Sequence, residues 1–142
     1  MERHNADEVD RKSRPRKSFV IISGYHDYRS KRKADLHFIA DEIKKRGDVS
    51  FFSLRYSYLT RYREDPRHDL WDRANRCEDA GGVGCYLWRT PIHPFRLPRR
   101  FALIERALFG VFSRYLPKVM RAVIARADIV FERAACRLFT FP

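Results

Sequence analysis

The feature that most constrains the fold is the apolar run Ser18–Ile22, SFVII, which is rich in β-branched residues. The polar pair Ser23 and Gly24 closes this run. A continuous apolar run without polar alternation is typical of a strand buried on both faces, as in a parallel sheet. Because parallel strands need a long crossover connection, we expect a helix and then another strand to follow.

The next segments provide that helix and that strand. Apolar residues recur at helical spacing across 33–46, and Gly47 stands where a C-terminal cap is expected. Val49–Leu54 is the next strand-like run. Together the segments predict a βαβ unit with a right-handed crossover.

The remainder of the chain continues the alternation of strands and helices. The polar stretch 62–78 has only a weak pattern, which predicts a short helix around Leu70–Arg76. Three prolines in 90–98 exclude a regular helix there and predict a loop. The expected fold class is α/β and Rossmann-like, with a mostly parallel sheet, flanking helices and ligands at the carboxyl ends of the strands. The other expected elements are a strand at Val83–Arg89, a helix along Phe101–Tyr115 that Pro117 interrupts, a resumed helix at Val119–Ala127 and a strand at Ala127–Phe131.

Length and charge limit the domain count and the partners. The 142 residues accommodate one domain, which we place at 18–132 after a polar, disordered, basic tail at 1–17. The 30 lysines and arginines against 18 acidic residues give a net charge of +12. Such an excess favours an acidic partner: nucleic acid, an anionic membrane surface or a phosphorylated ligand.

Several kinds of site and location are disfavoured. The N-terminus has no apolar signal region, and no apolar run reaches the roughly 18 residues that span a bilayer, so we expect a cytoplasmic protein. Cys77, Cys85 and Cys136 lack C-x-x-C spacing, which favours reduced thiols over a disulfide framework or a zinc site. Gly24 and the glycines of 81–84 fit neither G-x-G-x-x-G nor a P-loop.

Three loops that follow predicted strands, 24–33, 55–63 and 90–96, are rich in aromatic and basic residues. Arginine forks bind phosphates or carboxylates, and aromatic rings stack on sugars or bases. Because the carboxyl ends of parallel strands meet at one edge, we predict a polar, anionic ligand there, although exposed loops are generally polar. The histidines give weaker signals. Adjacent His26 and Asp27 are not expected to form a catalytic dyad, His37 is expected to pack or cap its helix, and His93 to shape its loop.

The apolar stripe of Phe101–Tyr115 has two interpretations. Basic residues flank it, which is typical of a helix docked in the interface of an anionic membrane. The alternative is a helix that covers the sheet, as an α/β layer requires. The membrane-contact candidates are Arg99, Arg100, Phe101, Ile104, Arg106, Leu108 and Phe112.

Several motifs in a fixed order make the chain resemble the N-terminal half of the xanthan-type, GumK-like glucuronosyltransferases. The similarity runs from Phe19 to Glu132. It lies in HDYRSKRKADLHFIADEI, FFSLRYSYLTRYR, the D-x-x-N spacing of Asp72 and Asn75, and CYLWRTPIHPF.

The resemblance implies an inverting, metal-independent glycosyltransferase of the GT-B fold without a cofactor. Such enzymes transfer glucuronic acid from UDP-glucuronate to a polyprenyl-diphosphate-linked oligosaccharide in exopolysaccharide synthesis, at the cytoplasmic face of the inner membrane. The N-terminal Rossmann-like domain receives the acceptor. The acceptor-binding candidates are then Tyr25, His26, Asp27, Arg29, Arg55, Tyr56, Tyr58, Arg61, Arg89 and His93.

This sequence also departs from the family. Asp35 stands where the family has an asparagine before the helix histidine. The family's catalytic aspartate and donor domain are expected beyond this chain, so no residue is assigned as the base and the chain alone is expected to be inactive. The tail 133–142 shows no recognisable likeness to the family, and we expect a frameshifted or truncated copy of a longer enzyme. The leading interpretation is a membrane-peripheral, acceptor-binding domain; the alternative is a basic nucleic-acid-binding module.

Overall fold

A five-stranded sheet with the strand order β3-β4-β2-β1-β5 forms the centre of the molecule. The structure, a computed structural model, describes residues 16–92 and 98–132. Strands β1, β2, β4 and β5 are parallel, and β3 runs antiparallel to β4. The elements are β1 (Lys17–Ser23), α2 (Asp35–Ile43), β2 (Gly47–Ser57), the 3₁₀ helices η1 (Tyr58–Tyr62) and η2 (His68–Arg73), β3 (Cys77–Asp79), β4 (Val83–Thr90), the 3₁₀ helix η3 (Arg99–Phe101), α3 (Ala102–Arg114), α4 (Lys118–Arg126) and β5 (Ile129–Glu132).

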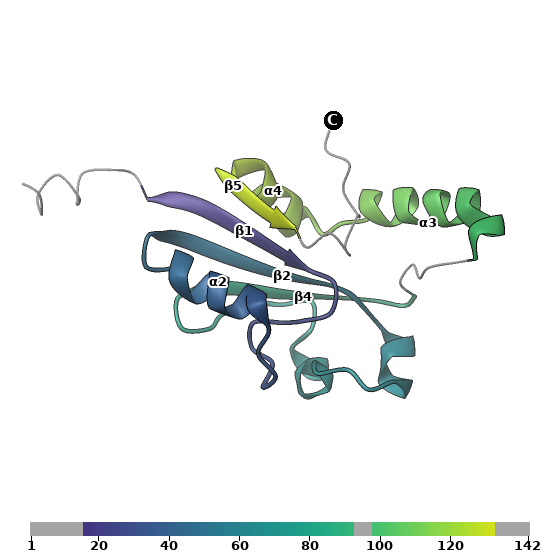
Figure 1. Ribbon diagram of the computed structural model, residues 1–142, viewed down its shortest axis with the longest axis horizontal. Helices are drawn as coiled ribbons and strands as arrows, with labels where there is room; N and C mark the ends of the chain where they lie inside the picture. The colour runs from purple at the N-terminus through teal and green to yellow at the C-terminus, as the bar shows by residue number, and fades with distance from the viewer. Residues whose placement is uncertain (1–15, 93–97, 133–142) are drawn as a thin grey trace, which may run out of the picture.

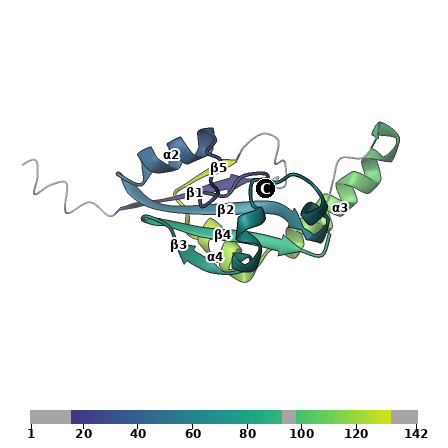
Figure 2. The same cartoon turned by 90° about the horizontal axis from the view of Figure 1, so that it is seen from below.

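Helices cover both faces of the sheet, α2 on one side and α4 on the other (Figures 1 and 2). Successive residues of β1 point to opposite faces. Val20 and Ile22 belong to the core under α4, and Ile21 belongs to the core under α2. This two-sided burial explains why SFVII is apolar without alternation, and it confirms the predicted α/β fold with a mostly parallel sheet.

The structure differs from the sequence-based expectation at Gly47. The helix ends before it, with Lys44 as the C-terminal cap, and Gly47 is the first residue of β2. A Cβ atom there would collide with the Lys17 carbonyl oxygen and the Phe19 ring. The glycine is therefore required because β1 and β2 approach closely, not because a helix must be capped.

The weak stretch 62–78 also folds differently from the predicted helix. It forms the short η2 and then β3, with Asn75 between them in the left-handed region at a φ of 60°. Asparagine tolerates that conformation better than most residues. The prediction missed β3 because a three-residue strand carries no periodic signal.

Helix α3 extends past the end of the sheet and leaves most of its surface exposed (Figures 1 and 2). Phe109 and Phe112, toward its C-terminal end, pack against the core under α4. The Phe112 ring lies 4.4 Å from the Trp88 ring, centroid to centroid. Within residues 16–92 and 98–132, no helix is long and apolar enough to cross a bilayer.

Candidate functional site

The carboxyl ends of β1, β2 and β4 meet at one edge of the sheet, which we call the rim. The side chains of Tyr25, after β1, and Arg55, near the end of β2, are joined there. Arg55 Nη1 donates a 2.8 Å hydrogen bond to the Tyr25 hydroxyl. The same guanidinium lies 5.6 Å from the Tyr25 ring and 5.3 Å from the Phe109 ring of α3. Segments thirty residues apart in sequence thus share one surface, as the parallel topology requires.

Arg55 reaches this position because β2 is irregular. The pairing of β2 with β4 shifts register between Ser53 and Tyr56, and Arg55 has a φ of 55°. A non-glycine residue in this region costs about 1–3 kcal/mol and is kept only where its surroundings impose it.

Arg67 supplies those surroundings, and its side chain has no exposed surface. Its Nη1 donates to the carbonyl oxygens of Leu54, at 2.7 Å, and Gly24, at 3.2 Å, and its Nη2 donates to that of Arg55 at 3.5 Å. An ion pair of 2.7 Å with Asp65 balances its charge. One buried guanidinium therefore ties the loop after β1 to the irregular part of β2.

A second group on the rim consists of Tyr58, Arg61, Trp71 and Arg89, which we call the Trp71 cluster. The guanidinium carbons of Arg61 and Arg89 lie 5.6 Å and 4.6 Å from the centroid of the Trp71 ring. Arg89 also lies 5.4 Å from the Tyr58 ring, and Tyr58 meets Trp71 edge to face at 5.3 Å. These residues come from η1, η2 and the end of β4.

Asn75 holds the backbone of Arg89. Its side chain accepts a 2.8 Å hydrogen bond from the Arg89 N–H and donates one of 3.1 Å to the Arg89 carbonyl. Arg89 Nη1 donates in turn to the Trp71 carbonyl at 2.9 Å. The asparagine of the D-x-x-N spacing is thus a structural partner of β4.

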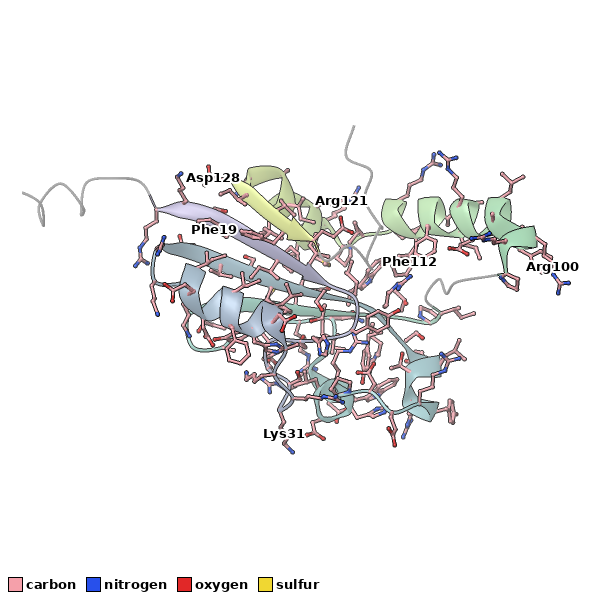
Figure 3. All side chains as sticks on the ribbon, viewed as in Figure 1. Phe19, Lys31, Arg100, Phe112, Arg121 and Asp128 are labelled. Atoms are coloured by element: carbon pink, nitrogen blue, oxygen red, sulfur yellow. The ribbon has the colours of Figure 1, made fainter. Side chains whose placement is uncertain are left out.

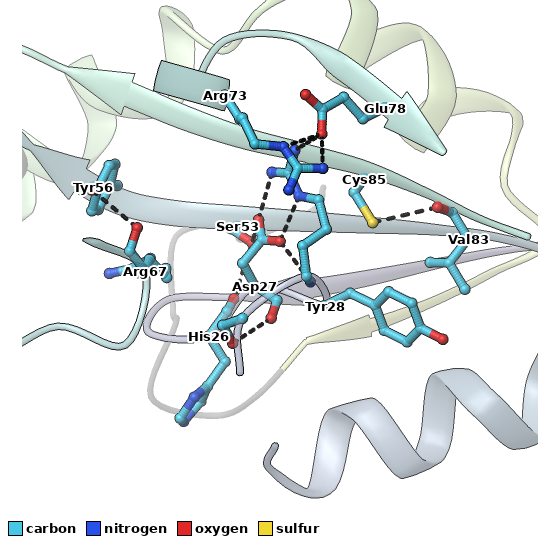
Figure 4. Close-up of polar contacts among 12 residues, drawn as sticks. His26, Asp27, Tyr28, Ser53, Tyr56, Arg67, Arg73, Glu78, Val83 and Cys85 are labelled. Atoms are coloured by element: carbon cyan, nitrogen blue, oxygen red, sulfur yellow. Dashed lines mark hydrogen bonds and ion pairs between the residues drawn. The ribbon is translucent and has the colours of Figure 1, made fainter. Parts of the chain in front are cut away.

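An ion network lies beside the rim (Figure 4). Asp27 is fully buried; it pairs with Arg29 at 2.8 Å and accepts a 2.7 Å hydrogen bond from the Ser53 hydroxyl. Arg29 also binds Glu78 of β3, which Arg73 contacts as well. Burial alone would raise the pKa of Asp27, but the hydrogen bonds and charge of Arg29, with the Ser53 hydroxyl, hold it below its usual value. Arg73 and Arg29 lower the pKa of Glu78 to about 2.

His37 fulfils the predicted packing and capping role. It is fully buried on α2. Its Nδ1 accepts a 2.9 Å hydrogen bond from the Ala34 N–H, so the proton is on Nε2, which donates to the Asp27 carbonyl at 2.7 Å. Asp35, the departure from the family pattern, is an exposed residue of the first helical turn.

The structure separates the acceptor-binding candidates into two groups. Tyr25, Tyr58 and Arg61 are exposed, and His26 and Arg89 are half-buried. Asp27 and Tyr56 have no exposed surface, and the Arg29 and Arg55 side chains are nearly enclosed. Asp27, Arg29 and Tyr56 therefore have structural roles, because a ligand cannot reach them in this conformation, and Arg55 is reachable only beside Tyr25. His93 lies outside the described residues.

The membrane-contact candidates also fall into two groups, exposed residues and one core residue. Phe101, Ile104 and Leu108 are exposed apolar residues of η3 and α3, and Arg99, Arg100 and Arg106 are exposed beside them. Figure 3 shows Arg100 at the free end of this segment and Phe112 near the sheet. Phe112 is half-buried against Trp88, so it is a core contact and not a surface residue.

Sequence reasoning missed Arg67 and Trp71 as members of the site. Both lie in the weakly patterned stretch 62–78. A tryptophan in a segment that is otherwise rich in arginine and aspartate was the available signal. Across the described ranges 16–92 and 98–132, no group of histidine, cysteine and acidic side chains could hold a metal ion.

Comparison with known proteins gives two matches. The sequence model of the family described as "Glucuronosyltransferase GumK, N-terminal domain" matches residues 21–140. The match continues past Glu132, the residue at which the resemblance was expected to end. The UDP-glucuronate:glycolipid 2-beta-glucuronosyltransferase of Xanthomonas campestris pv. campestris is 42% identical over 119 residues, which cover 82% of this chain and 30% of that protein. The chain therefore spans less than a third of the length of this curated relative.

Proposed function

The chain belongs to the family of GumK glucuronosyltransferase N-terminal domains, and we propose that its rim binds the glycolipid acceptor of a glucuronosyltransferase. The observation that carries the proposal is the meeting of Tyr25, Arg55 and the Trp71 cluster at the carboxyl ends of the parallel strands. Ligands of open α/β sheets bind at that edge. Aromatic faces suit sugar rings, and guanidinium groups suit phosphates.

We further propose that the acceptor is an oligosaccharide linked to a polyprenyl diphosphate, and that the enzyme inverts the anomeric configuration of glucuronic acid from UDP-glucuronate. The relative's description as a transferase from UDP-glucuronate to a glycolipid supports this. The 142-residue chain alone should neither bind UDP-glucuronate appreciably nor transfer sugar. Calorimetric titration with UDP-glucuronate tests the first statement; turnover of a lipid-linked acceptor without added protein would contradict the second.

We also propose that α3 contacts the anionic surface of the inner membrane from the cytoplasmic side. Leu103, Ile104 and Leu108 are 83%, 54% and 44% exposed, more than a helix that covers a sheet requires. Arg99, Arg100 and Arg106 flank them. Apolar side chains at the headgroup boundary and basic residues beside them are the two contributions that hold a helix on such a surface.

Binding to vesicles tests the acceptor and membrane proposals separately. The full chain should bind anionic vesicles, and binding should increase when they carry the lipid-linked acceptor. Each basic residue near the surface contributes about 1 kcal/mol, so R99E/R100E/R106E should weaken binding to acceptor-free vesicles by roughly a hundredfold or more.

The matched control is R32E/R63E/R76E, which makes the same change of charge at three exposed positions away from α3. It should retain most of the vesicle binding. Equal losses in both variants would show that only the total charge matters. Tight binding to single-stranded DNA without binding to vesicles would favour the nucleic-acid alternative.

A further inference from the structure

The Trp71 cluster holds two positive charges, and no carboxylate of the described residues lies within ion-pair distance of either. In residues 16–92 and 98–132, no ion pair includes Arg61 or Arg89. By contrast, Arg67 and the neighbouring Arg29 and Arg73 are each paired with a carboxylate. Two cations near one ring repel each other unless an anion joins them. The arrangement is therefore suited to an anionic ligand.

Arg89 is oriented before any ligand binds. Asn75 fixes its backbone, the Trp71 carbonyl accepts one of its N–H groups at 2.9 Å, and the Tyr58 and Trp71 rings lie beside its guanidinium. A guanidinium has five N–H donors, so most of them remain able to donate hydrogen bonds to a phosphate. Restricting a side chain in advance lowers the entropy lost on binding.

Tyr58 adds an apolar face next to that fork. Its side chain is 52% exposed, although one part of the ring contacts Trp71 and Arg89. A pyranose ring can place its C–H face on such a ring while a phosphate on the same sugar reaches the guanidinium. Because the Arg89 guanidinium itself lies over the Tyr58 ring at 5.4 Å, a sugar on the exposed part of that ring would have its phosphate close to the fork.

We propose that the Trp71 cluster is a subsite for a glycosyl phosphate, with Arg89 and Arg61 on the phosphate and Tyr58 on the sugar. This inference rests on the proposed function and assigns the anionic part of the acceptor to one part of the rim. Tyr25 and Arg55 are left for sugar units farther from the phosphate.

Calorimetric titration of the full chain with glucose 1-phosphate and with inorganic pyrophosphate tests the subsite at near-physiological ionic strength, where long-range attraction is screened. R61Q loses one charge-assisted contact, so its affinity for each ligand should fall about tenfold, and the affinity of R89Q should fall at least as much. The control R63Q removes an exposed arginine outside the cluster and should bind as the unchanged chain does. Because Arg61 is exposed, R61Q remains informative if R89Q folds poorly.

The sugar contact has its own pair of variants. Y58A should lower the affinity for glucose 1-phosphate several-fold, because the substitution removes the aromatic ring on which the sugar stacks. The affinity for pyrophosphate, which has no sugar, should fall less. Tyr62 is 86% exposed in the same 3₁₀ helix, and Y62A is the matched control. Tryptophan fluorescence should change when glucose 1-phosphate is added, and this change should be absent in W71F. The other tryptophan, Trp88, lies in the core and would not respond to a ligand at the rim.

The outcomes separate this inference from the proposed function. If R61Q and R89Q bind both probes as tightly as R63Q does, the subsite is wrong, while acceptor-dependent vesicle binding would still support the proposed function. If the probes bind through Arg61 and Arg89 but acceptor-bearing vesicles give no increase, the phosphate comes from a free sugar phosphate and the acceptor proposal fails.

Discussion

Arg67, which is buried behind the rim, and the arginines of α3 are the same residue type in opposite settings. Arg67 has no exposed surface and binds three carbonyl oxygens and a carboxylate. Arg99, Arg100 and Arg106 are exposed, and the described part of the chain offers them no ion pair. The contrast shows that a net charge of +12 combines a structural and a surface contribution, which the composition alone cannot separate.

The difference has a physical basis in the guanidinium group. Its planar fork can satisfy several acceptors at once and is less strongly hydrated than an ammonium, so it can be buried where its partners are fixed. On an exposed helix the same group remains in water and contributes through long-range charge. Removing the buried Arg67 should therefore affect stability, whereas removing an exposed arginine of α3 should affect binding.

Replacing Arg67 with alanine should give the largest loss of stability, about 3–5 kcal/mol, because it leaves Asp65 and the Leu54 and Gly24 carbonyls without their buried partner. Urea unfolding followed by circular dichroism measures the loss. The exposed Arg63 is the matched control, and R63A should change the unfolding free energy by no more than about 0.5 kcal/mol. Equal losses in R67A and R63A would contradict the proposed difference between buried and exposed arginines.

Asp27→Ala should cost somewhat less, about 3 kcal/mol, because Glu78 continues to neutralise the buried Arg29. The comparison is D69A, which removes an exposed ion pair of 2.8 Å with Lys31 and should change the unfolding free energy little, because water and salt screen that pair. Chemical denaturation near neutral pH measures both. A D27A loss as small as that of D69A would mean that the buried pair contributes little.

The ion network also predicts a dependence on pH. The pKa of Glu78 falls from 4.5 to about 2 on folding, so its stabilising effect is complete above pH 4.5 and is lost as the pH falls toward 2. Asp27, whose pKa is also lowered, acts in the same direction. The unfolding free energy should fall less steeply in E78Q than in the unchanged chain over this range. In the exposed control E64Q, the unfolding free energy should depend on pH as it does in the unchanged chain. The same dependence in E78Q would show that the ionisation of Glu78 does not stabilise the fold.

The smallest effect on stability should come from α3. Because Arg99, Arg100 and Arg106 are exposed, R99E/R100E/R106E should leave the circular dichroism spectrum unchanged and shift the unfolding free energy by about 0.5 kcal/mol per substitution at most. Thermal melting of the variant beside the unchanged chain measures the shift. A loss as large as that of R67A would place these arginines in the fold itself.

The sequence predicts the repeating elements of the fold well. SFVII and the two later apolar runs are continuous enough to indicate strands, and they form β1, β2 and β4 in the expected parallel arrangement. The amphipathic segment before Gly47 has helical periodicity and forms α2. The edge where the loops meet follows from that topology, so the sequence also locates the rim.

The side chains of the rim are less predictable. Asp27 and Tyr56 have the chemistry of ligand-binding residues, and only the packing shows that the fold encloses them. Arg67 and Trp71 acquire their partners from segments that no periodic pattern connects to them. A buried arginine and an exposed one are identical in sequence, so their roles depend on tertiary contacts.

The way Arg67 holds the rim has a consequence for how this surface can diversify. Apart from Asp65, the hydrogen-bond acceptors of its guanidinium are the main-chain oxygens of Gly24, Leu54 and Arg55, atoms that every amino acid supplies. Exchanging the side chain at position 55 or at its neighbour Tyr25 would leave these bonds in place. Related proteins could thus acquire new acceptor preferences by exchanging side chains on an unchanged backbone, provided that the arginine which secures it is retained.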